Sequence, residues 1–194
     1  MDKVLNLILK GEPIIVPTDT VYGLVCRYDS KSAIEKIYKL KKRSRKKPLI
    51  LLGYNWNALK KFVIYKKNPQ SPILNPQSLI LNPQSSILNS QIKWPGPLTI
   101  VLPISKRVPK FLNKGFKTIG VRVPNNTFLL KLLKHCPGRV LASTSANISG
   151  KSNRHPQKEL IKKVNLFIRA KRKEMSFKPS RIIEITKRKI KILR

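Results

Sequence analysis

Apolar residues along the first fifty positions recur with the two periods that distinguish strands from helices. Residues 14–16 form a short apolar run that ends at a proline, which predicts a buried strand. Residues 31–40 repeat apolar positions at helical spacing, and Ser32 followed three residues later by Glu35 fits a capping box at the start of this helix. Residues 48–52 predict the next strand. The first part of the chain therefore predicts alternating strands and helices.

The second half of the chain contains further short apolar segments that do not alternate strictly between strand and helix patterns. Strands are predicted at residues 98–102, 118–123 and 139–143, helices at 128–136 and 157–164, and a terminal hairpin at 181–193. Helices and strands mixed in this way favour an α/β fold with a twisted sheet and some antiparallel pairing. A chain of 194 residues is long enough for one well-buried domain, so residues 1–194 are expected to form a single domain.

A tandem repeat interrupts this pattern at about residues 68–91. Seven-residue near-copies begin at Asn68, Asn75 and Asn82, and a weaker copy begins at Asn89. A seven-residue period is typical of a coiled coil, but the prolines in the copies oppose a helix and the apolar positions are adjacent. The repeat therefore predicts an extended low-complexity loop, with a folded element as the alternative.

The charge of the chain is unusual and limits its possible partners. Lys and Arg number 42 against 8 acids, a formal net charge of +34, and no acid lies between Glu35 and Glu159. Such a surface suits nucleic acid, a nucleotide triphosphate or an anionic membrane, while compositional bias is the alternative explanation for many of the lysines. No apolar run is long enough to span a membrane, and the N-terminus lacks the pattern of a secretory signal, so a cytoplasmic protein without a membrane partner is expected. Cys26 and Cys136 have no metal or disulfide spacing and are expected to be buried free thiols.

Four polar segments interrupt apolar ones at places where a core would not need them. Residues 17–24 bring hydroxyls and a carboxylate to the end of a strand, and residues 41–49 gather cations at a helix exit, where a triphosphate could bind. In residues 118–124, period-two alternation places Arg122 on the polar face beside a glycine that leaves room for a carboxylate or phosphate. Residues 143–150 supply small hydroxyls and amides. Taken singly, the four segments have ordinary structural explanations, which are a capped turn, a solvated charge run, an amphipathic strand and a Ser-rich turn.

Taken together and in order, these segments resemble the YrdC/TsaC family. The resemblance covers essentially the whole chain apart from the repeat, and its most specific parts are Trp94-Pro95-Gly96-Pro97-Leu98-Thr99 and Ser145-Ala146-Asn147. It implies a YrdC-like twisted mixed sheet with helices around a large basic cavity. It also implies a nucleotidyltransferase that joins L-threonine, bicarbonate and ATP into threonylcarbamoyl-AMP and pyrophosphate for modification of a tRNA adenosine next to the anticodon.

The resemblance also implies a role for individual residues. It places the threonine on Thr20, Arg122, Ser143 and Ser180, and catalysis on Lys41 and Arg43. It places ATP on Arg43, Lys47, Thr118, Ser145, Asn153 and Arg194. Mg²⁺ is expected to arrive with ATP, and no metal site on the protein is expected. The expected partners are the three substrates, tRNA bound weakly and without sequence preference, and the tRNA threonylcarbamoyl-transferase machinery downstream.

The chain departs from the family pattern at two places. Leu52 stands where the family often has a threonine-binding His, and residues 165–171 lack the usual acids and glycines. A YrdC-like RNA-binding module with reduced or lost catalysis is therefore the main alternative. A carbamoyl-adenylate activity like that of hydrogenase-maturation carbamoyltransferases is a third possibility, which the lack of acylphosphatase-like and zinc-finger segments disfavours.

Overall fold

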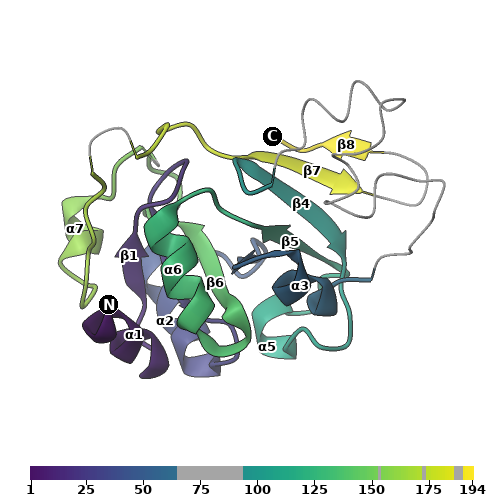
Figure 1. Ribbon diagram of the computed structural model, residues 1–194, viewed down its shortest axis with the longest axis horizontal. Coiled ribbons are helices and arrows are strands. Elements are labelled where there is room, and N and C mark those ends of the chain that lie inside the picture. The colour runs from purple at the N-terminus through teal and green to yellow at the C-terminus, as the bar shows by residue number, and fades with distance from the viewer. Residues whose placement is uncertain (65–93, 153, 172–173, 186–189) are drawn as a thin grey trace.

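The computed structural model describes residues 1–64, 94–152, 154–171, 174–185 and 190–194. The predicted repeat at 68–91 and the ATP-site candidate Asn153 lie outside these ranges. Within them, eight strands form one sheet in the order β1-β2-β6-β3-β5-β4-β7-β8 (Figure 1). The strands are β1 (Ile14–Val16), β2 (Gly23–Arg27), β3 (Ile50–Gly53), β4 (Leu98–Pro103), β5 (Thr118–Arg122), β6 (Val140–Ser145), β7 (Arg181–Ile185) and β8 (Ile190–Ile192).

The sheet is mixed, as the sequence predicted. β3 pairs with β5 and β4 pairs with β7 in parallel, while all other neighbours are antiparallel. The helices are α1 (Asp2–Leu9), α2 (Lys31–Lys41), α3 (Trp56–Leu59), α5 (Lys110–Asn113), α6 (Thr127–His135) and α7 (Lys158–Ile161), with 3-10 turns at Lys60–Phe62 and Pro137–Arg139. None of the described helices is long and apolar enough to cross a membrane.

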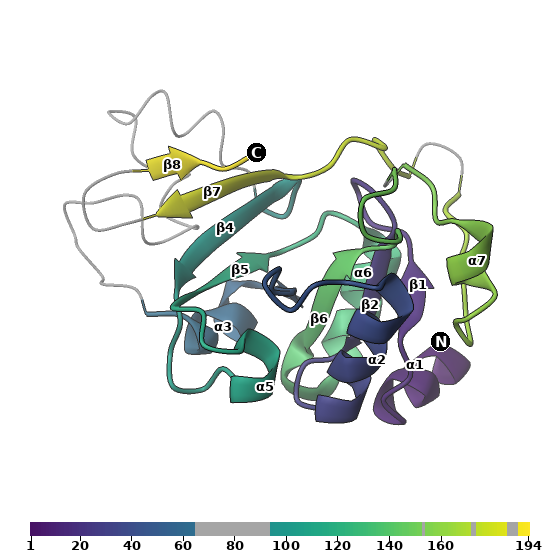
Figure 2. The ribbon, with the colours of Figure 1, turned by 180° about the vertical axis from the view of Figure 1, so that it is seen from behind.

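Helices cover both faces of the sheet, which explains the uninterrupted apolar runs of its strands. α1 and α6 lie on the face seen in Figure 1, and α2 lies on the opposite face, in front in Figure 2. In β1, Ile14 and Val16 pack in the cluster of α1 and α6, whereas Ile15 packs with α2. Because successive side chains alternate between the faces, a three-residue apolar run can serve two cores.

Most predicted elements are confirmed, and the differences have local causes. The start of α2 at Lys31 was predicted correctly but its cap was not, because Ser30 and not Ser32 caps the helix. Ser30 has an extended backbone, and its side chain accepts a hydrogen bond from the Ala33 amide. The last predicted helix is shorter than residues 157–164, and α1, β2, α3 and α5 were not predicted.

The two cysteines are buried and free, as predicted, and burial raises the pKa of both thiols.

Candidate active site

A cavity of about 180 Å³ opens on the sheet face that carries α1 and α6. The strand pairing explains which side chains meet there. Leu52 of β3 is in register with Arg122 of β5, and Ile50 of β3 is in register with Ser143 of β6, so these residues share one face. The alternation expected for residues 118–124 is therefore confirmed, but the face with Arg122 borders a cavity and is not open to solvent.

The cavity brings together seven of the residues predicted for substrate binding. They come from the loop after β1, the segment after α2, strands β5 and β6, the segment before β7 and the C-terminal segment, and are Thr20, Arg43, Arg122, Ser143, Ser145, Ser180 and Arg194. Lys41 does not line the cavity but is buried directly beside it. Lys47 is exposed, and Thr118 lies at the end of β5 away from Arg122. The structure therefore does not bring Lys47 and Thr118 into the cavity.

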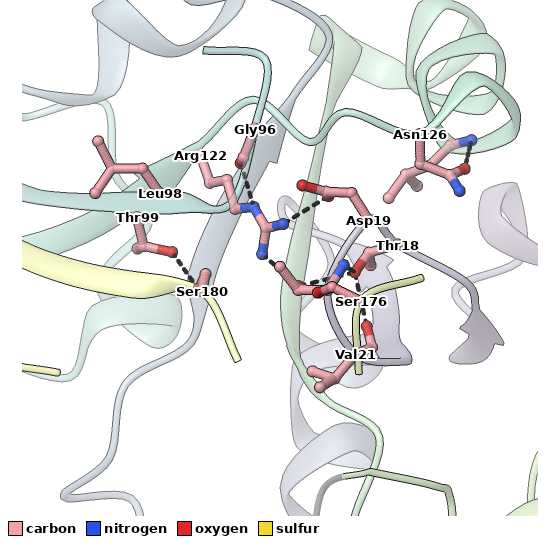
Figure 3. Close-up of polar contacts among 12 residues, drawn as sticks. Thr18, Asp19, Val21, Gly96, Leu98, Thr99, Arg122, Asn126, Ser176 and Ser180 are labelled. Carbon is pink, nitrogen blue, oxygen red and sulfur yellow. Dashed lines mark hydrogen bonds and ion pairs between the residues drawn. The ribbon is translucent and has the colours of Figure 1, made fainter. Parts of the chain in front are cut away.

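Arg122 is held on three sides at the base of the cavity (Figure 3). Its Nε donates to the Gly96 carbonyl (3.0 Å), its Nη1 donates to Thr20 Oγ1 (2.9 Å), and its Nη2 donates to Asp19 Oδ1 (2.6 Å). The side chain of Arg122 is only 5% exposed. Burial lowers the pKa of this guanidinium, and the charge of Asp19 opposes that effect. A guanidinium has five N–H donors, so two remain for a ligand, as many as a carboxylate accepts in a bidentate pair.

The loop that holds Arg122 is itself fixed on two sides. Thr18 Oγ1 donates to the Val21 carbonyl (2.7 Å) and accepts from the Thr20 amide (3.0 Å), which closes a tight turn. The carbonyls of Asp19 and Thr20 accept hydrogen bonds from the amides of Ser176 (3.1 Å) and Phe177 (2.8 Å). The second carboxylate oxygen of Asp19 is buried and has no hydrogen-bond partner among the described residues. This loop therefore presents a fixed hydroxyl and a fixed carboxylate to Arg122.

Lys41 joins the end of α2 to the loop that follows β6. Its Nζ donates to the carbonyls of Ser145 and Asn147 and to Asn147 Oδ1, the last at 3.1 Å. Ser145 Oγ donates to the same Asn147 Oδ1 (2.6 Å). Burial lowers the pKa of the Lys41 ammonium to about 7, and the charge of Arg43 acts in the same direction. In this arrangement Lys41 positions Ser145, and its own ammonium does not reach the cavity.

Arg43 and Arg194 line the cavity without a carboxylate. Arg43 donates from Nε to the Lys47 carbonyl (2.9 Å) and from Nη2 to the Pro48 carbonyl (3.2 Å), and Arg194 donates from Nε to the Ser180 carbonyl (3.2 Å). Neither forms an ion pair with an acid among the described residues. Burial lowers the pKa of both guanidiniums. Three arginines therefore meet around one cavity, and Arg122 alone among them is paired with an acid of the described residues.

The glycine beside Arg122 has a different role from the one expected. A Cβ at Gly120 would lie 2.8 Å from Ile50 Cγ2 and 3.1 Å from Thr99 Cγ2, so neighbouring side chains already fill the space above it. Gly120 allows Ile50 and Thr99 to close the cavity floor and leaves no room for a ligand. Leu52, which stands at the position of the family His, lines the cavity as an apolar neighbour of Arg122.

Sequence reasoning did not assign a role to Asp19 or Thr99. Thr99 Oγ1 lies 3.1 Å from Ser180 Oγ, which links β4 to the segment before β7. Both residues lie inside segments that were singled out, residues 17–24 and 94–99. A signal for Asp19 was available, because it follows a buried strand and a buried carboxylate requires a cationic partner.

Comparisons with known proteins show the family of the chain. The Sua5/YciO/YrdC family model, described as "Telomere recombination", matches residues 6–194. A threonylcarbamoyl-AMP synthase of Pseudoalteromonas translucida is 35% identical over 148 residues, which are 76% of this chain and 71% of the relative. A threonylcarbamoyl-AMP synthase of Pyrococcus abyssi is 32% identical over 167 residues, 84% of this chain but 44% of the relative.

Solved structures have the same fold. The crystal structure of P. abyssi Sua5 complexed with L-threonine matches with a TM-score of 0.76 and 27% identity, over 99% of this chain and 52% of that one. Escherichia coli YciO matches with a TM-score of 0.74 and 24% identity, over 100% of this chain and 87% of that one. The chain thus spans about half the length of the P. abyssi protein. By its sequence and its fold, the chain belongs to the Sua5/YciO/YrdC family.

Proposed function

We propose that this chain is a threonylcarbamoyl-AMP synthase, which forms threonylcarbamoyl-AMP and pyrophosphate from L-threonine, bicarbonate and ATP. The observation that carries the proposal is the division of the cavity into a neutralised and an un-neutralised part. Arg122 is paired with Asp19, while Arg43 and Arg194 contact only carbonyl oxygens among the described residues. Relatives of 31–38% identity share the name threonylcarbamoyl-AMP synthase, which favours this reading over an RNA-binding module without catalysis.

The neutralised part suits the amino acid. An amino-acid carboxylate would take the two remaining N–H groups of Arg122 in a bidentate pair, in reach of the Thr20 hydroxyl that already contacts this guanidinium. Ser143 and Ser180 offer hydroxyls to the amine or the side-chain hydroxyl, and Leu52 offers an apolar surface to the methyl group. The neighbour complexed with L-threonine has the same fold, which supports this assignment.

The un-neutralised part suits the triphosphate of ATP. Guanidiniums without a counter-ion bind phosphate oxygens strongly when they are partly desolvated, as Arg43 and Arg194 are. Ser145 adds a hydroxyl whose loop is held in place by Lys41. The described residues that line the cavity include no carboxylate, so they do not form a Mg²⁺ site of their own. Mg²⁺ would therefore enter on the phosphates as part of the substrate.

The proposed reaction depends more on the positioning of the substrates and the neutralisation of their charge than on acid–base groups. The neutral amine of threonine adds to CO₂, which is in equilibrium with bicarbonate, and releases a proton as the carbamate forms. A carbamate oxygen then attacks the α-phosphorus of ATP, and the bond to the β-phosphate oxygen breaks to release pyrophosphate. Holding both anions in one cavity removes the entropic barrier to their encounter, and the arginines offset their repulsion. The proposed place of the reaction is the cytoplasm, upstream of the transferase machinery that modifies tRNA.

The test is pyrophosphate release by the purified protein with ATP, Mg²⁺, bicarbonate and labelled threonine. We expect release only when threonine and bicarbonate are both present, together with labelled threonylcarbamoyl-AMP. Serine in place of threonine and a bicarbonate-free buffer serve as controls. Pyrophosphate release that does not depend on either substrate, or no release at all, would contradict the proposal.

A further inference from the structure

Gln157 occupies the N-cap position of α7, but its side chain does not cap the helix. N-cap positions favour Ser, Thr, Asp and Asn, whose short side chains reach the first amides of a helix. Gln157 has an extended backbone there, and its side chain makes no capping hydrogen bond. Its main-chain carbonyl accepts from the amides of Leu160 (2.9 Å) and Ile161 (3.0 Å), which any residue could provide. The helix therefore does not explain the glutamine side chain.

The side chain of Gln157 instead holds the β6–α7 loop, residues 146–157. Its Oε1 accepts a hydrogen bond from the Ile148 amide (2.8 Å), and its Nε2 donates to the carbonyls of Ser152 (2.8 Å) and His155 (3.3 Å). The described part of this loop contains no helix or strand, so its backbone groups need partners of another kind. One half-buried carboxamide provides partners for three of these backbone groups.

The same loop fixes the orientation of the Asn147 carboxamide. Asn147 Nδ2 donates to the carbonyls of Ile148 (3.1 Å) and Lys151 (2.6 Å). Its Oδ1 accepts from Ser145 Oγ (2.6 Å) and from Lys41 Nζ (3.1 Å). The reverse orientation would place the amide nitrogen against an ammonium and the amide oxygen against two carbonyls. Because both donors and the oxygen are in use, the carboxamide has one favourable orientation.

The contacts of Gln157 lie next to the two carbonyls that orient Asn147. The Ile148 amide belongs to the same residue as the first carbonyl, and the Ser152 carbonyl follows the Lys151 carbonyl by one residue. The loop therefore cannot shift at either place without breaking a hydrogen bond to the Gln157 side chain. The hydroxyl that Asn147 holds lines the cavity, so the effect of these contacts extends to the ligand site.

We infer that Gln157 is a positioning residue for ATP, which fixes the loop that orients Asn147 and, through Asn147, the hydroxyl of Ser145. The inference rests on the proposed function, which assigns Ser145 to ATP. Gln157 does not line the cavity itself, so it acts through other residues and not by contact with the ligand. A binding group keeps its productive geometry only when surrounding packing and hydrogen bonds hold it there, and Gln157 provides such support.

The test compares Gln157→Met with Asn57→Met. Methionine has no N–H donor and is only a weak acceptor, so it removes the contacts of Gln157 with the loop. Gln157→Glu, which keeps an acceptor for the Ile148 amide but loses the donors, is a second and milder variant. Asn57 is the matched control, because it is an exposed amide on α3, across the molecule from α7 in Figures 1 and 2. Thermal unfolding confirms that each variant is folded.

Pyrophosphate release gives kcat and the KM for ATP, and calorimetric titration gives the threonine affinity. We expect Gln157→Met to raise the KM for ATP by about tenfold, because a small misplacement of a binding group has effects of this size or more. Gln157→Glu should raise it by less, about threefold. The kcat should change by less than about threefold, since the lost contact is made in the ground state as well as in the transition state. Threonine affinity and the kinetics of Asn57→Met should stay close to the wild type.

A second background distinguishes positioning from a general loss of stability. If Gln157 acts through the Ser145 hydroxyl, Gln157→Met should change the KM for ATP by less than about twofold in a Ser145→Ala protein, whereas independent effects would multiply. Multiplied effects, an unchanged KM in both variants of Gln157, or an equal rise in Asn57→Met would overturn the inference. A fall in kcat and threonine affinity as large as the rise in KM would do the same.

Binding of α,β-methylene-ATP keeps this result separate from the proposed function, because the bond that the proposed reaction breaks is replaced in this analogue. Suppose that the wild type releases no pyrophosphate, but Gln157→Met weakens the analogue and the effect disappears in Ser145→Ala. The synthase proposal then fails and the role of Gln157 stands. Pyrophosphate release that depends on both substrates, with Gln157→Met like the wild type, gives the opposite result. A wild type that neither binds the analogue nor releases pyrophosphate would overturn both.

Discussion

Arg122 and Arg43 line the same cavity but differ in what neutralises them. Arg122 is paired with a carboxylate at 2.6 Å and is almost fully buried, whereas Arg43 donates to two backbone carbonyls and has no ion pair among the described residues. A buried arginine and its counter-ion together have a small net charge. Such an arginine therefore recognises a ligand mainly through the geometry of its free N–H groups. A cation that contacts only dipoles keeps its full charge and attracts the most highly charged anion available.

The comparison shows how one cavity can sort a singly charged carboxylate from a triphosphate. Asp19 reduces the attraction of Arg122 for phosphate, while Arg43 and Arg194 stay available for it. If the cavity binds both substrates as proposed, the loop around Thr18 contributes to selectivity as well as to structure. Each of the following experiments tests one part of this division.

The largest effect is expected at the neutralised arginine. Arg122→Ala should cost about 2–4 kcal/mol of threonine binding, because a charge-assisted bidentate pair is lost, and should leave ATP binding nearly unchanged. Calorimetric titration of each ligand measures both. Since Asp19 would remain buried without its partner, the double variant Arg122→Ala with Asp19→Asn controls for loss of stability. Unchanged threonine affinity would remove Arg122 from the amino-acid site.

The reciprocal change is made at the un-neutralised arginine. Arg43→Gln should cost about 1.5–3 kcal/mol of ATP binding, because hydrogen bonds to a charged group are lost, with little effect on threonine. Lys46→Gln, an exposed residue of the same basic segment, is the matched control and should have little effect. If Arg43→Gln weakens both ligands equally, the cavity is not divided as we describe.

A pH experiment tests the buried ammonium of Lys41 beside the cavity. The pKa of Lys41 is about 7 in the folded protein, below its value in the unfolded chain, so above pH 7 the unfolded chain binds the additional proton. The free energy of unfolding should therefore rise with pH, by about 1.5 kcal/mol from this group between about pH 7 and about pH 8.5. Urea unfolding should show this increment in the wild type and in Lys39→Met but not in Lys41→Met. The same pH dependence of stability in all three proteins would contradict a lowered pKa of Lys41.

The smallest effect is expected from the counter-ion itself. Asp19→Asn should keep a hydrogen bond to Arg122 but remove the negative charge, which makes Arg122 resemble Arg43. Inorganic phosphate should then compete with threonine about fivefold better, equivalent to about 1 kcal/mol of added attraction. Inhibition constants against threonine, with wild type beside the variant, measure this. Phosphate competition that stays the same or weakens would show that Asp19 only positions Arg122.

Several features could be predicted because they depend on neighbouring residues. The alternation around Arg122 was correct because period two is a property of the extended backbone, and the apolar face of α2 was correct because helical spacing is equally local. The capping residue was missed because Ser30 and Ser32 both suit a cap, and only the path of the chain before α2 decides between them. β2 was missed because its first two residues, Gly23 and Leu24, were assigned to the polar segment at residues 17–24.

The candidate site likewise has features that follow from local sequence and features that depend on the tertiary structure. The sequence by itself determined the family, the mixed fold, the acid-free stretch and seven of the side chains that line the cavity. Only the tertiary structure decided that Asp19 neutralises Arg122 across 103 positions, that Lys41 holds the loop of Ser145, and that Thr118 and Lys47 lie outside the cavity. The physical reason is that charge pairing and burial depend on distances in space, which strand order and register set and which no local pattern contains.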